Sequence, residues 1–514
     1  MNPPIGTSSR GGGLAPRRGQ GRGGRYLYFN KPREPLKPDL TKHPLGDLVD
    51  TISASDLDVG ANTTSHSTEI SGCKYVSSYN WTNDASSTIV VPGKPPKWTP
   101  LAEPQRLKED SGQYFRDLNA AKNPSYPMAP AVHAVLEKDY HYHTDEIDIF
   151  ACGSTLGNLL RFARGMDKPF RFNLQVIKHT VFLIRKENDP KQFIEGVRGY
   201  GHTFPEAYTT WSDPKNSISH QRIIRYKFGG LTHLLRFESD GYIPDLCPKD
   251  TTPPPQSSDD DTKNNSPEED LILSSQDLII GSLPNTPRLT IKTPKHSSSS
   301  TTSTPPQSTL FDLKTRSGKH NKKIDMTDIL PQLWLKRIPN FITAYHDGAG
   351  LFTDICVQNI ETEVSAWATE NAAGIKKFAV LLQELVRVAR EHSPLGNDTL
   401  LEVYCPDKEK LEVRMQFGEG NEALPYWLRE RWEEGSKVFA GSSSDDDEIG
   451  GGDDDGDNCG GLWLPNRYEE WYSNENDEDF GPSRRYRSYY DSGSEPDYTA
   501  CSASDCGYCG RCSY

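Results

Sequence analysis

The sequence contains no run of 18 or more apolar residues, and its N-terminus has no basic segment followed by an apolar one. We therefore expect no membrane-spanning helix and no secretory signal. Cysteine gives no disulfide framework either, because the ten cysteines are scattered singly or gathered in the last fourteen residues. Without a secretory signal we expect free thiols in a reducing compartment. The expected location is the nucleus, the cytoplasm or both.

Charge is distributed unevenly along the 514 residues, whose net charge is −14. The first 33 residues hold seven Lys or Arg and no acidic residue, while residues 441–514 hold 18 Asp or Glu and 5 Arg, a net charge of 5 − 18 = −13. Such ends predict tails on one folded core. The N-terminal Arg–Gly segment is of a kind that binds RNA, although a flexible basic tail without a partner has the same composition.

Composition divides the chain further. We predict disorder in residues 1–103, which are first Arg/Gly-rich and then rich in Pro, Ser and Thr, in an insert over residues 245–307, and in an acidic tail with a cysteine cluster over residues 435–514. Segments 104–244 and 308–434 show the apolar spacing of helices and strands. Together they predict a single α+β domain that is split by the insert.

Apolar periodicity places the elements of this domain. Helices are expected at residues 128–136, 153–164, 325–337, 361–392 and 424–432. Strands are expected at residues 147–150, 171–177, 180–184, 310–315, 340–346, 351–359, 400–405 and 410–415, with a hairpin over 222–243 that turns at Gly229-Gly230.

Two strand-like runs carry charged residues at alternate positions, as Glu238-x-Asp240 and Asp312-x-Lys314. Since residues i and i+2 of a strand share a face, neighbouring strands would gather three carboxylates and one ammonium group. Such carboxylates repel one another unless a divalent cation lies between them, and a cation with bound water is suited to splitting phosphodiesters. Taken alone, the same residues are also ordinary polar positions at strand ends.

The order of these motifs resembles that of the decapping exonuclease family (DXO-type, with fungal relatives that partner a nuclear exonuclease). The resemblance covers about residues 147–359 and implies a mixed two-sheet, nuclease-like core of the PD-(D/E)xK group with flanking helices. It is carried by GYGHTFPE with Glu206, RYKFGGLTHLLRFESD with Glu238 and Asp240, Asp312-Leu-Lys314-Thr315, and PQLWLKRIPNFITAYHDGAG with Gln332.

The resemblance implies metal-dependent processing of RNA 5′ ends, by decapping, pyrophosphate removal or 5′→3′ exoribonuclease activity. The implied partners are RNA 5′ ends and a partner 5′→3′ exoribonuclease. Mg²⁺ or Mn²⁺ would be held by four carboxylates, Glu206, Glu238, Asp240 and Asp312. Lys314 would act in catalysis with Asp240 and Asp312, while Gln332 and Arg222 would bind the substrate.

Two departures from the family pattern bear on catalysis. Cys152 stands where the family has an Arg that contacts the nucleic-acid backbone, and Asp312 stands where it has a Glu. The alternative interpretation is therefore a nuclease-fold protein, impaired in catalysis, that binds RNA or a partner exonuclease. A prenyl diphosphate synthase is disfavoured, because the Asp runs at 259–261 and 445–447 lie in Ser/Gly-rich segments rather than on apolar helices.

Four cysteines lie close together near the C-terminus, with a spacing that would allow a tetrahedral Zn²⁺ site. Structural zinc sites usually consist of two pairs joined by a longer loop, which this segment lacks. Free or redox-active thiols are the alternative for Cys501, Cys506, Cys509 and Cys512.

Overall fold

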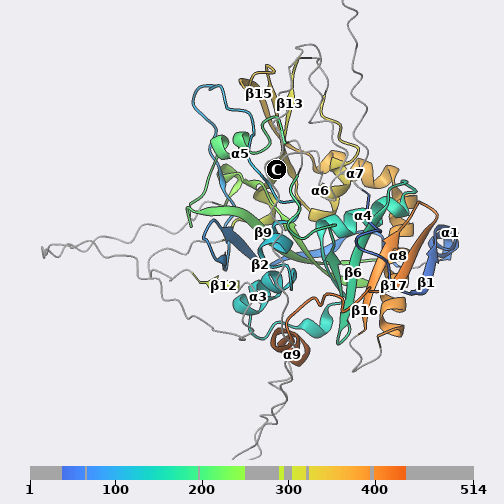
Figure 1. Cartoon of the computed structure of the whole chain (residues 1–514). Coiled ribbons are helices and arrows are strands. Elements are labelled where there is room, and N and C mark those ends of the chain that lie inside the picture. The colour runs from blue at the N-terminus through green and yellow to red at the C-terminus, as the bar shows by residue number, and fades with distance from the viewer. Residues whose placement is uncertain are drawn as a thin grey trace, which may run out of the picture. The chain divides into compact units, whose positions relative to one another are not determined.

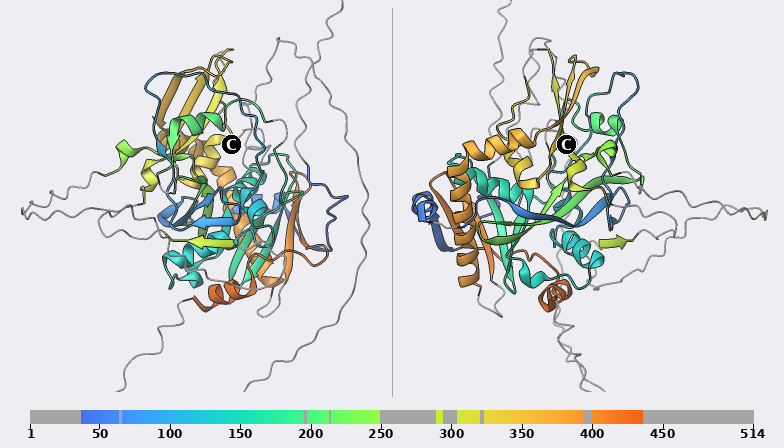
Figure 2. Two further views of the ribbon diagram at one scale, coloured as in Figure 1. Left: turned by 60° about the vertical axis from the view of Figure 1, so that its left-hand side comes forward. Right: turned by 180° about the vertical axis from the view of Figure 1, so that it is seen from behind.

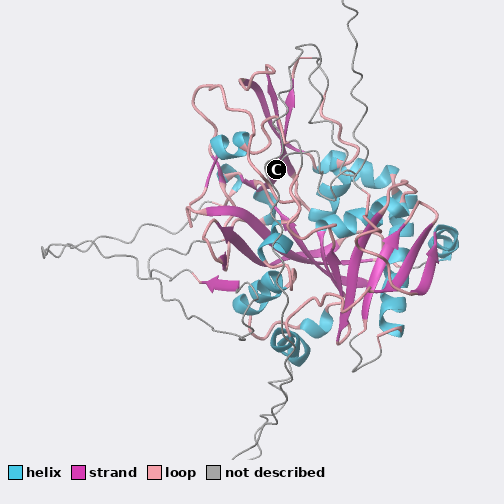
Figure 3. Ribbon diagram, viewed as in Figure 1, coloured by secondary structure: helices cyan, strands magenta, loops and turns pink. Residues whose placement is uncertain are grey.

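The computed structural model describes residues 37–63, 66–194, 197–212, 214–248, 289–293, 304–319, 323–393 and 399–435. These residues form two β-sheets with helices packed against them (Figures 1 and 3). The predicted α+β class with a mixed two-sheet core is confirmed. Over these ranges, each helix is too short or too polar to cross a lipid bilayer.

The larger sheet has eleven strands. Their order across the sheet is β1 (Leu48–Ser53), β17 (Lys410–Met415), β16 (Leu400–Cys405), β6 (Phe170–Ile177), β7 (Thr180–Arg185), β5 (Ile149–Cys152), β10 (Leu231–Glu238), β9 (Ser217–Phe228), β2 (Ser71–Thr82), β3 (Ser87–Val90) and β12 (Leu289–Lys292). The smaller sheet has the order β15 (Phe352–Asn359), β14 (Asn340–His346), β13 (Leu310–Ser317), β11 (Gly241–Tyr242), β4 (Lys97–Trp98) and β8 (Thr209–Thr210).

Helices cover both faces of the larger sheet (Figures 1 and 2). Strand β5 shows why, since its alternate side chains enter different cores: Ile149 and Ala151 pack with α4 and α8, whereas Phe150 packs with α3 and α9. The helices are α1 (Ala54–Thr63), α2 (Leu118–Lys122), α3 (Ala129–Lys138), α4 (Gly153–Ala163), α5 (Thr203–Tyr208), α6 (Ile329–Lys336), α7 (Glu361–Glu370), α8 (Ala372–Glu391) and α9 (Tyr426–Glu434).

The chain passes from the larger sheet to the smaller one directly after β10. Strands β9 and β10 form the predicted hairpin, with positive φ angles of 58° and 78° at Gly229 and Gly230. Strand β10 ends at Glu238, and after two intervening residues β11 pairs with β13 in the smaller sheet. This crossing brings the Glu-x-Asp motif next to the Asp-x-Lys motif on β13.

The prediction of disorder over residues 1–103 is wrong for its described part, because β2 pairs with β9 in the middle of the larger sheet. Strand β2 was not predicted because its composition is polar. Ser78 and Asn80 are fully buried, and their side chains donate hydrogen bonds to the backbone carbonyls of Gly93 and Lys94. Strand β12 likewise corrects the predicted insert, since it pairs with β3. The rest of the predicted tails and insert lies outside the described residues, apart from short ends.

Two predicted helices have different bounds. The long helix expected over 361–392 is two helices, α7 and α8, which meet at Asn371, where the Asn371 side chain donates to the Trp367 carbonyl. Helix α6 begins two residues before Pro331. The proline therefore lies in the first turn, where its missing N–H has no intrahelical partner to lose.

Candidate functional site

Three neighbouring strands of the larger sheet, β7, β5 and β10, run parallel to one another. Carboxyl ends of parallel strands meet at one edge of a sheet, and such an edge commonly binds ligands. Here the strands end at Arg185, Cys152 and Glu238. Helix α4 begins directly after Cys152, so its unpaired N-terminal amides lie at the same edge.

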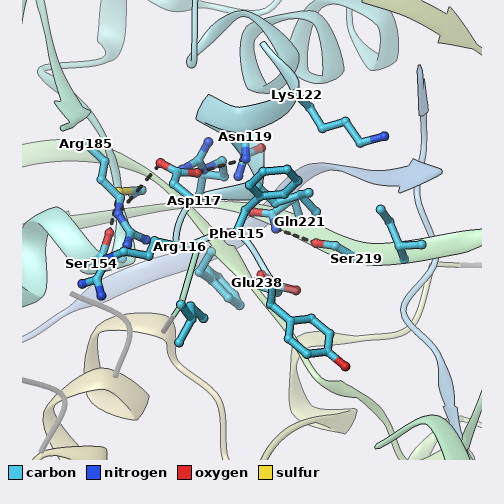
Figure 4. Close-up of a pocket in the computed structure, with 18 of the residues that line it drawn as sticks. Phe115, Arg116, Asp117, Asn119, Lys122, Ser154, Arg185, Ser219, Gln221 and Glu238 are labelled. Carbon is cyan, nitrogen blue, oxygen red and sulfur yellow. Dashed lines mark hydrogen bonds and ion pairs between the residues drawn. The ribbon is translucent and has the colours of Figure 1, made fainter. Parts of the chain in front are cut away.

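A pocket of about 680 Å³ opens at this edge. Figure 4 shows Arg116, Arg185 and Ser154 together on one side of it, and Glu238 across from them. We call the side next to the start of α4 the basic side, because arginines gather there around the carboxylate of Asp117, and the side with Glu238 the acidic side. We refer to this cavity as the strand-end pocket.

The basic side holds three arginines that differ in their hydrogen-bond partners. Arg185 pairs with Glu187 at 2.6 Å, and Arg116 pairs with the same carboxylate at 3.1 Å. Arg236 is only 5% exposed, and its Nε and Nη1 atoms have no hydrogen-bond partner. Because a buried N–H without an acceptor is costly, Arg236 offers two donors to an acceptor that enters the pocket.

The acidic side is formed by two of the predicted metal ligands, Glu206 and Glu238. Burial, followed by the neighbouring Asp110 carboxylate, raises the pKa of Glu206. Burial also raises the pKa of Glu238, against the opposing effects of hydrogen bonds with Ser219 and Gln221. Raised pKa values of this kind are common in functional sites.

The other two predicted ligands, Asp240 and Asp312, lie where the two sheets meet. Burial and the neighbouring Asp312 carboxylate raise the pKa of Asp240 to about 7. The backbone N–H of Leu313 donates to Oδ2 of Asp240 at 2.6 Å. The prediction that the two motifs lie side by side is therefore matched by the structure at this pair of aspartates.

One ammonium group beside these carboxylates belongs to Lys336 on α6, a residue that the sequence analysis did not single out. Its Nζ atom lies 2.7 Å from Oδ2 of Asp312, and the residue is 3% exposed. The same ammonium opposes the rise that burial causes in the pKa of Glu238 and of Asp240. Lys336 is thus paired with Asp312 and also acts on Glu238 and Asp240, and we call these four residues the Lys336 cluster. At Asp240 the electrostatic effect of Lys314 is larger than that of Lys336.

As the side chains lie in this structure, they do not fit a divalent cation. Within the described ranges, no three or more His, Cys, Asp or Glu side chains are arranged to hold a metal ion. Glu206 lines the strand-end pocket, whereas Asp312 is paired with Lys336. The metal site at the four predicted carboxylates therefore stays a prediction.

The two predicted substrate-binding residues lie apart from the pocket lining. Gln332 packs against α4, where a Cβ on Gly157 would come within 2.4 Å of its Nε2 atom. Arg222 is 1% exposed and donates to the side chain of Gln307 at 2.8 Å and to the carbonyl of Pro305 at 2.9 Å. Their predicted roles remain untested, and the four C-terminal cysteines lie outside the described residues.

The fold and the site define a mixed two-sheet α+β protein with a charged pocket at the ends of parallel strands. The chain belongs to the family described as "Domain of unknown function (DUF8563)", whose model matches residues 52–429. No curated protein matches the sequence.

Solved structures similar to this chain include Rai1 proteins of three yeasts. Rai1 of S. pombe has 12% identity and a TM-score of 0.42, with 71% of this chain and 99% of that chain covered. Rai1 of Scheffersomyces stipitis, in complex with (3′-NADP)⁺ and calcium, has 13% identity and a TM-score of 0.45, with 72% and 98% covered. Rai1 of Candida albicans, in complex with pU5 and Mn²⁺, has 11% identity and a TM-score of 0.43, with 76% and 100% covered.

Proposed function

We propose that this protein binds the 5′ ends of RNA in the strand-end pocket and acts in RNA 5′-end processing. The observation that carries the proposal is the basic side of the pocket, where arginines from separate elements meet at the start of α4. Guanidinium groups and helix N-termini are the usual ligands of phosphate. The motif resemblance supports RNA as the polymer that carries this phosphate.

Aromatic side chains in the same pocket would bind the base of the 5′-terminal nucleotide. Phe115 and Trp211 line the same pocket, and the ring of Phe115 stacks on that of Phe193 with centroids 4.6 Å apart. Bases of single-stranded RNA stack on such rings. A 5′-terminal nucleotide would place its phosphate at the arginines and its base against these rings.

The test compares binding of one short RNA with a 5′-monophosphate or a 5′-hydroxyl, by fluorescence anisotropy with the full chain. We expect the 5′-phosphate to strengthen binding about tenfold, because charge-assisted contacts of this kind contribute roughly 1.5–3 kcal/mol. Any binding of internal phosphates by the Arg–Gly segment is the same for both RNAs. The difference between the two affinities therefore measures the contribution of the strand-end pocket.

The variant R116Q/K122Q removes two pocket cations, and we expect it to lose most of the 5′-phosphate effect. The control K408Q changes an exposed lysine on the β16–β17 turn and is expected to keep that effect. Equal affinity for both RNAs, or equal loss in the variant and the control, contradicts the proposal.

A second candidate function is hydrolysis of the RNA 5′ end with Mg²⁺ or Mn²⁺. It is favoured by the adjacency of Asp240 and Asp312, and by Oδ1 of Asp312, which is buried without a hydrogen-bond partner. The test is release of 5′ products from RNA with added Mn²⁺, by the parent chain and by D312A. Release by the parent that D312A abolishes establishes hydrolysis, whereas equal release by both contradicts it.

Further parts of the proposal are a partner 5′→3′ exoribonuclease and action in the nucleus or cytoplasm. The first derives from the motif resemblance. Co-purification of a tagged full chain with an exoribonuclease, and fluorescence imaging of the same chain, test them. Zinc content of the purified protein tests the C-terminal cysteines as a Zn²⁺ site.

A further inference from the structure

Cys152 occupies a special position in the fold. It is the last residue of β5 and immediately precedes the 11-residue helix α4. The residue is 4% exposed, yet it lines the strand-end pocket. A thiol at this place is shielded from bulk solvent and open to a small molecule inside the cavity.

Hydrogen-bonding groups surround the sulfur atom. Sγ lies 3.0 Å from Oγ of Ser154 and 3.1 Å from Oγ1 of Thr155, both in the first turn of α4. The N-terminal end of a helix also favours negative charge. Such surroundings stabilise a thiolate relative to a thiol.

Arg236 provides an independent observation that points to a negatively charged or oxygen-bearing group at this place. It pairs with Cys152 in the parallel register of β10 and β5. The residue is 95% buried, and its Nε and Nη1 atoms lack acceptors. Arg236 is also hydrogen-bonded with Tyr79. Within the described chain the two nitrogens without acceptors belong to a guanidinium that lines the same pocket edge as the sulfur, so an anion formed on Cys152 lies beside them.

We propose that Cys152 is a reactive thiolate at the base of the strand-end pocket, a modification site for hydroperoxides and small uncharged electrophiles. In the reaction with hydrogen peroxide, Sγ attacks one peroxide oxygen, an S–O bond forms and the O–O bond breaks. The departing hydroxide takes a proton from solvent to become water. The sulfur loses two electrons, the peroxide gains them, and Cys152 becomes a sulfenic acid beside Arg236.

The charges that face this thiol come from several elements. Arg236 on β10 and Arg185 on β7 are the cations that act on it, and Asp117 is the acidic group that acts on both arginines. Burial alone would raise the pKa of the Cys152 thiol, but the two arginines and the hydrogen bonds from α4 lower it overall. The balance of charges therefore supports the geometry.

Two other cysteines serve as internal controls. Cys405 is fully buried in a core, where burial raises its pKa, and Cys247 is partly exposed. The full chain, without RNA, is treated at pH 7 with iodoacetamide or with hydrogen peroxide and a sulfenic-acid trap, and each cysteine is followed by peptide mass spectrometry. We expect Cys152 to react about tenfold faster than Cys247, because the neighbouring arginines and the first turn of α4 favour its thiolate form, and Cys405 to stay unmodified.

Substitutions of Arg236 and Ser154 test whether these residues cause the reactivity of Cys152. R236Q is expected to slow Cys152 about tenfold, R236K to restore much of the rate, and S154A to slow it about threefold, with Cys405 still protected in each. Cys152 reacting no faster than Cys405 overturns the proposal, as does an unchanged Cys152 rate in R236Q. If Cys405 becomes reactive in R236Q, that variant is unfolded and the S154A variant is used instead. An unchanged Cys152 rate in S154A then overturns the proposal, and a slower Cys152 rate supports it. The readout involves no RNA, so failure of the proposed RNA binding leaves it intact.

Discussion

The ammonium nitrogen of Lys336 lies 2.7 Å from a carboxylate oxygen of Asp312, and the lysine is almost completely buried. This pair places a positive charge of the protein itself among the carboxylates that the sequence predicts as metal ligands. Breaking a buried ion pair leaves an uncompensated charge, which costs more than the pair gains. The Lys336 cluster therefore has consequences for stability and for metal binding.

Replacing Lys336 with methionine removes the buried cation while keeping most of the apolar stem. We expect K336M to lose about 3–5 kcal/mol in its free energy of unfolding. Added Mn²⁺ is expected to restore part of this loss, about 2.7 kcal/mol at a hundred times its dissociation constant, and to stabilise the parent less. Urea unfolding with Mn²⁺ or with EDTA measures both effects.

The control for this variant is K408M, since Lys408 is exposed and lies 3.9 Å from Glu409. An exposed pair contributes roughly 0–1 kcal/mol, so K408M should behave like the parent with and without Mn²⁺. If Mn²⁺ stabilises the parent as much as it stabilises K336M, Lys336 does not substitute for a divalent cation.

The same cluster predicts how RNA binding responds to metal removal. Because Lys336 already supplies a cation beside these carboxylates, and the phosphate is proposed to lie at the arginines, the affinity of the parent chain for 5′-phosphorylated RNA should change less than twofold on addition of EDTA. Fluorescence anisotropy at constant ionic strength measures this, since salt alone changes such affinities. A large loss with EDTA that Mn²⁺ reverses would show that the pocket binds RNA through a cation.

Gly241 lies where the chain crosses between the two sheets, and the space around it is too small for a side chain. A Cβ atom there would lie 2.6 Å from the ring of Phe311 and 2.7 Å from the carbonyl oxygen of Pro96. G241A should therefore lower the free energy of unfolding by about 1–3 kcal/mol, the usual cost of overpacking, and displace the adjacent Asp240. G318A is the matched control, because its nearest atoms would be 3.5 Å away. Equal stability of the two variants in urea contradicts this account.

His133 predicts sensitivity to acid. Burial lowers its pKa to about 3, and the residue is 5% exposed on α3. Between the ordinary pKa of about 6.5 and about 3, the unfolded chain binds a proton that the folded chain does not. The contribution of this group to stability is therefore complete above pH 6.5 and falls as the pH decreases through that range.

Between pH 7 and pH 5 the loss from His133 should amount to roughly 1–2 kcal/mol. H133L removes this titration and should reduce the acid-induced decrease by that amount, as measured by urea unfolding at the two pH values. H141Q changes an exposed histidine and should leave the decrease as in the parent. An H133L variant with the same pH dependence as the parent contradicts the prediction.

Some features were predicted from the sequence because they depend on local pattern. The β9–β10 hairpin is marked by Gly229-Gly230, and helix α4 by apolar residues at helical spacing. The adjacency of Asp240 and Asp312 followed from alternation along two strands and the motif resemblance. Strand β2 was missed because its serines and asparagine satisfy their hydrogen bonds inside the protein, which a polar composition does not reveal.

By itself, the sequence determined the α+β class and most elements after residue 104, because short-range periodicity encodes them, whereas the adjacency of the two acidic motifs was expected from the motif resemblance. Only the tertiary structure decided that Lys336 lies among the carboxylates and that Arg236, Arg185 and Cys152 meet in one pocket. Lys336 lies four residues beyond Gln332 on its helix, and Arg236 two residues before Glu238 on its strand, so each shares a face with a predicted residue. Their partners, however, come from segments far away in sequence, and strand order alone brings those segments together.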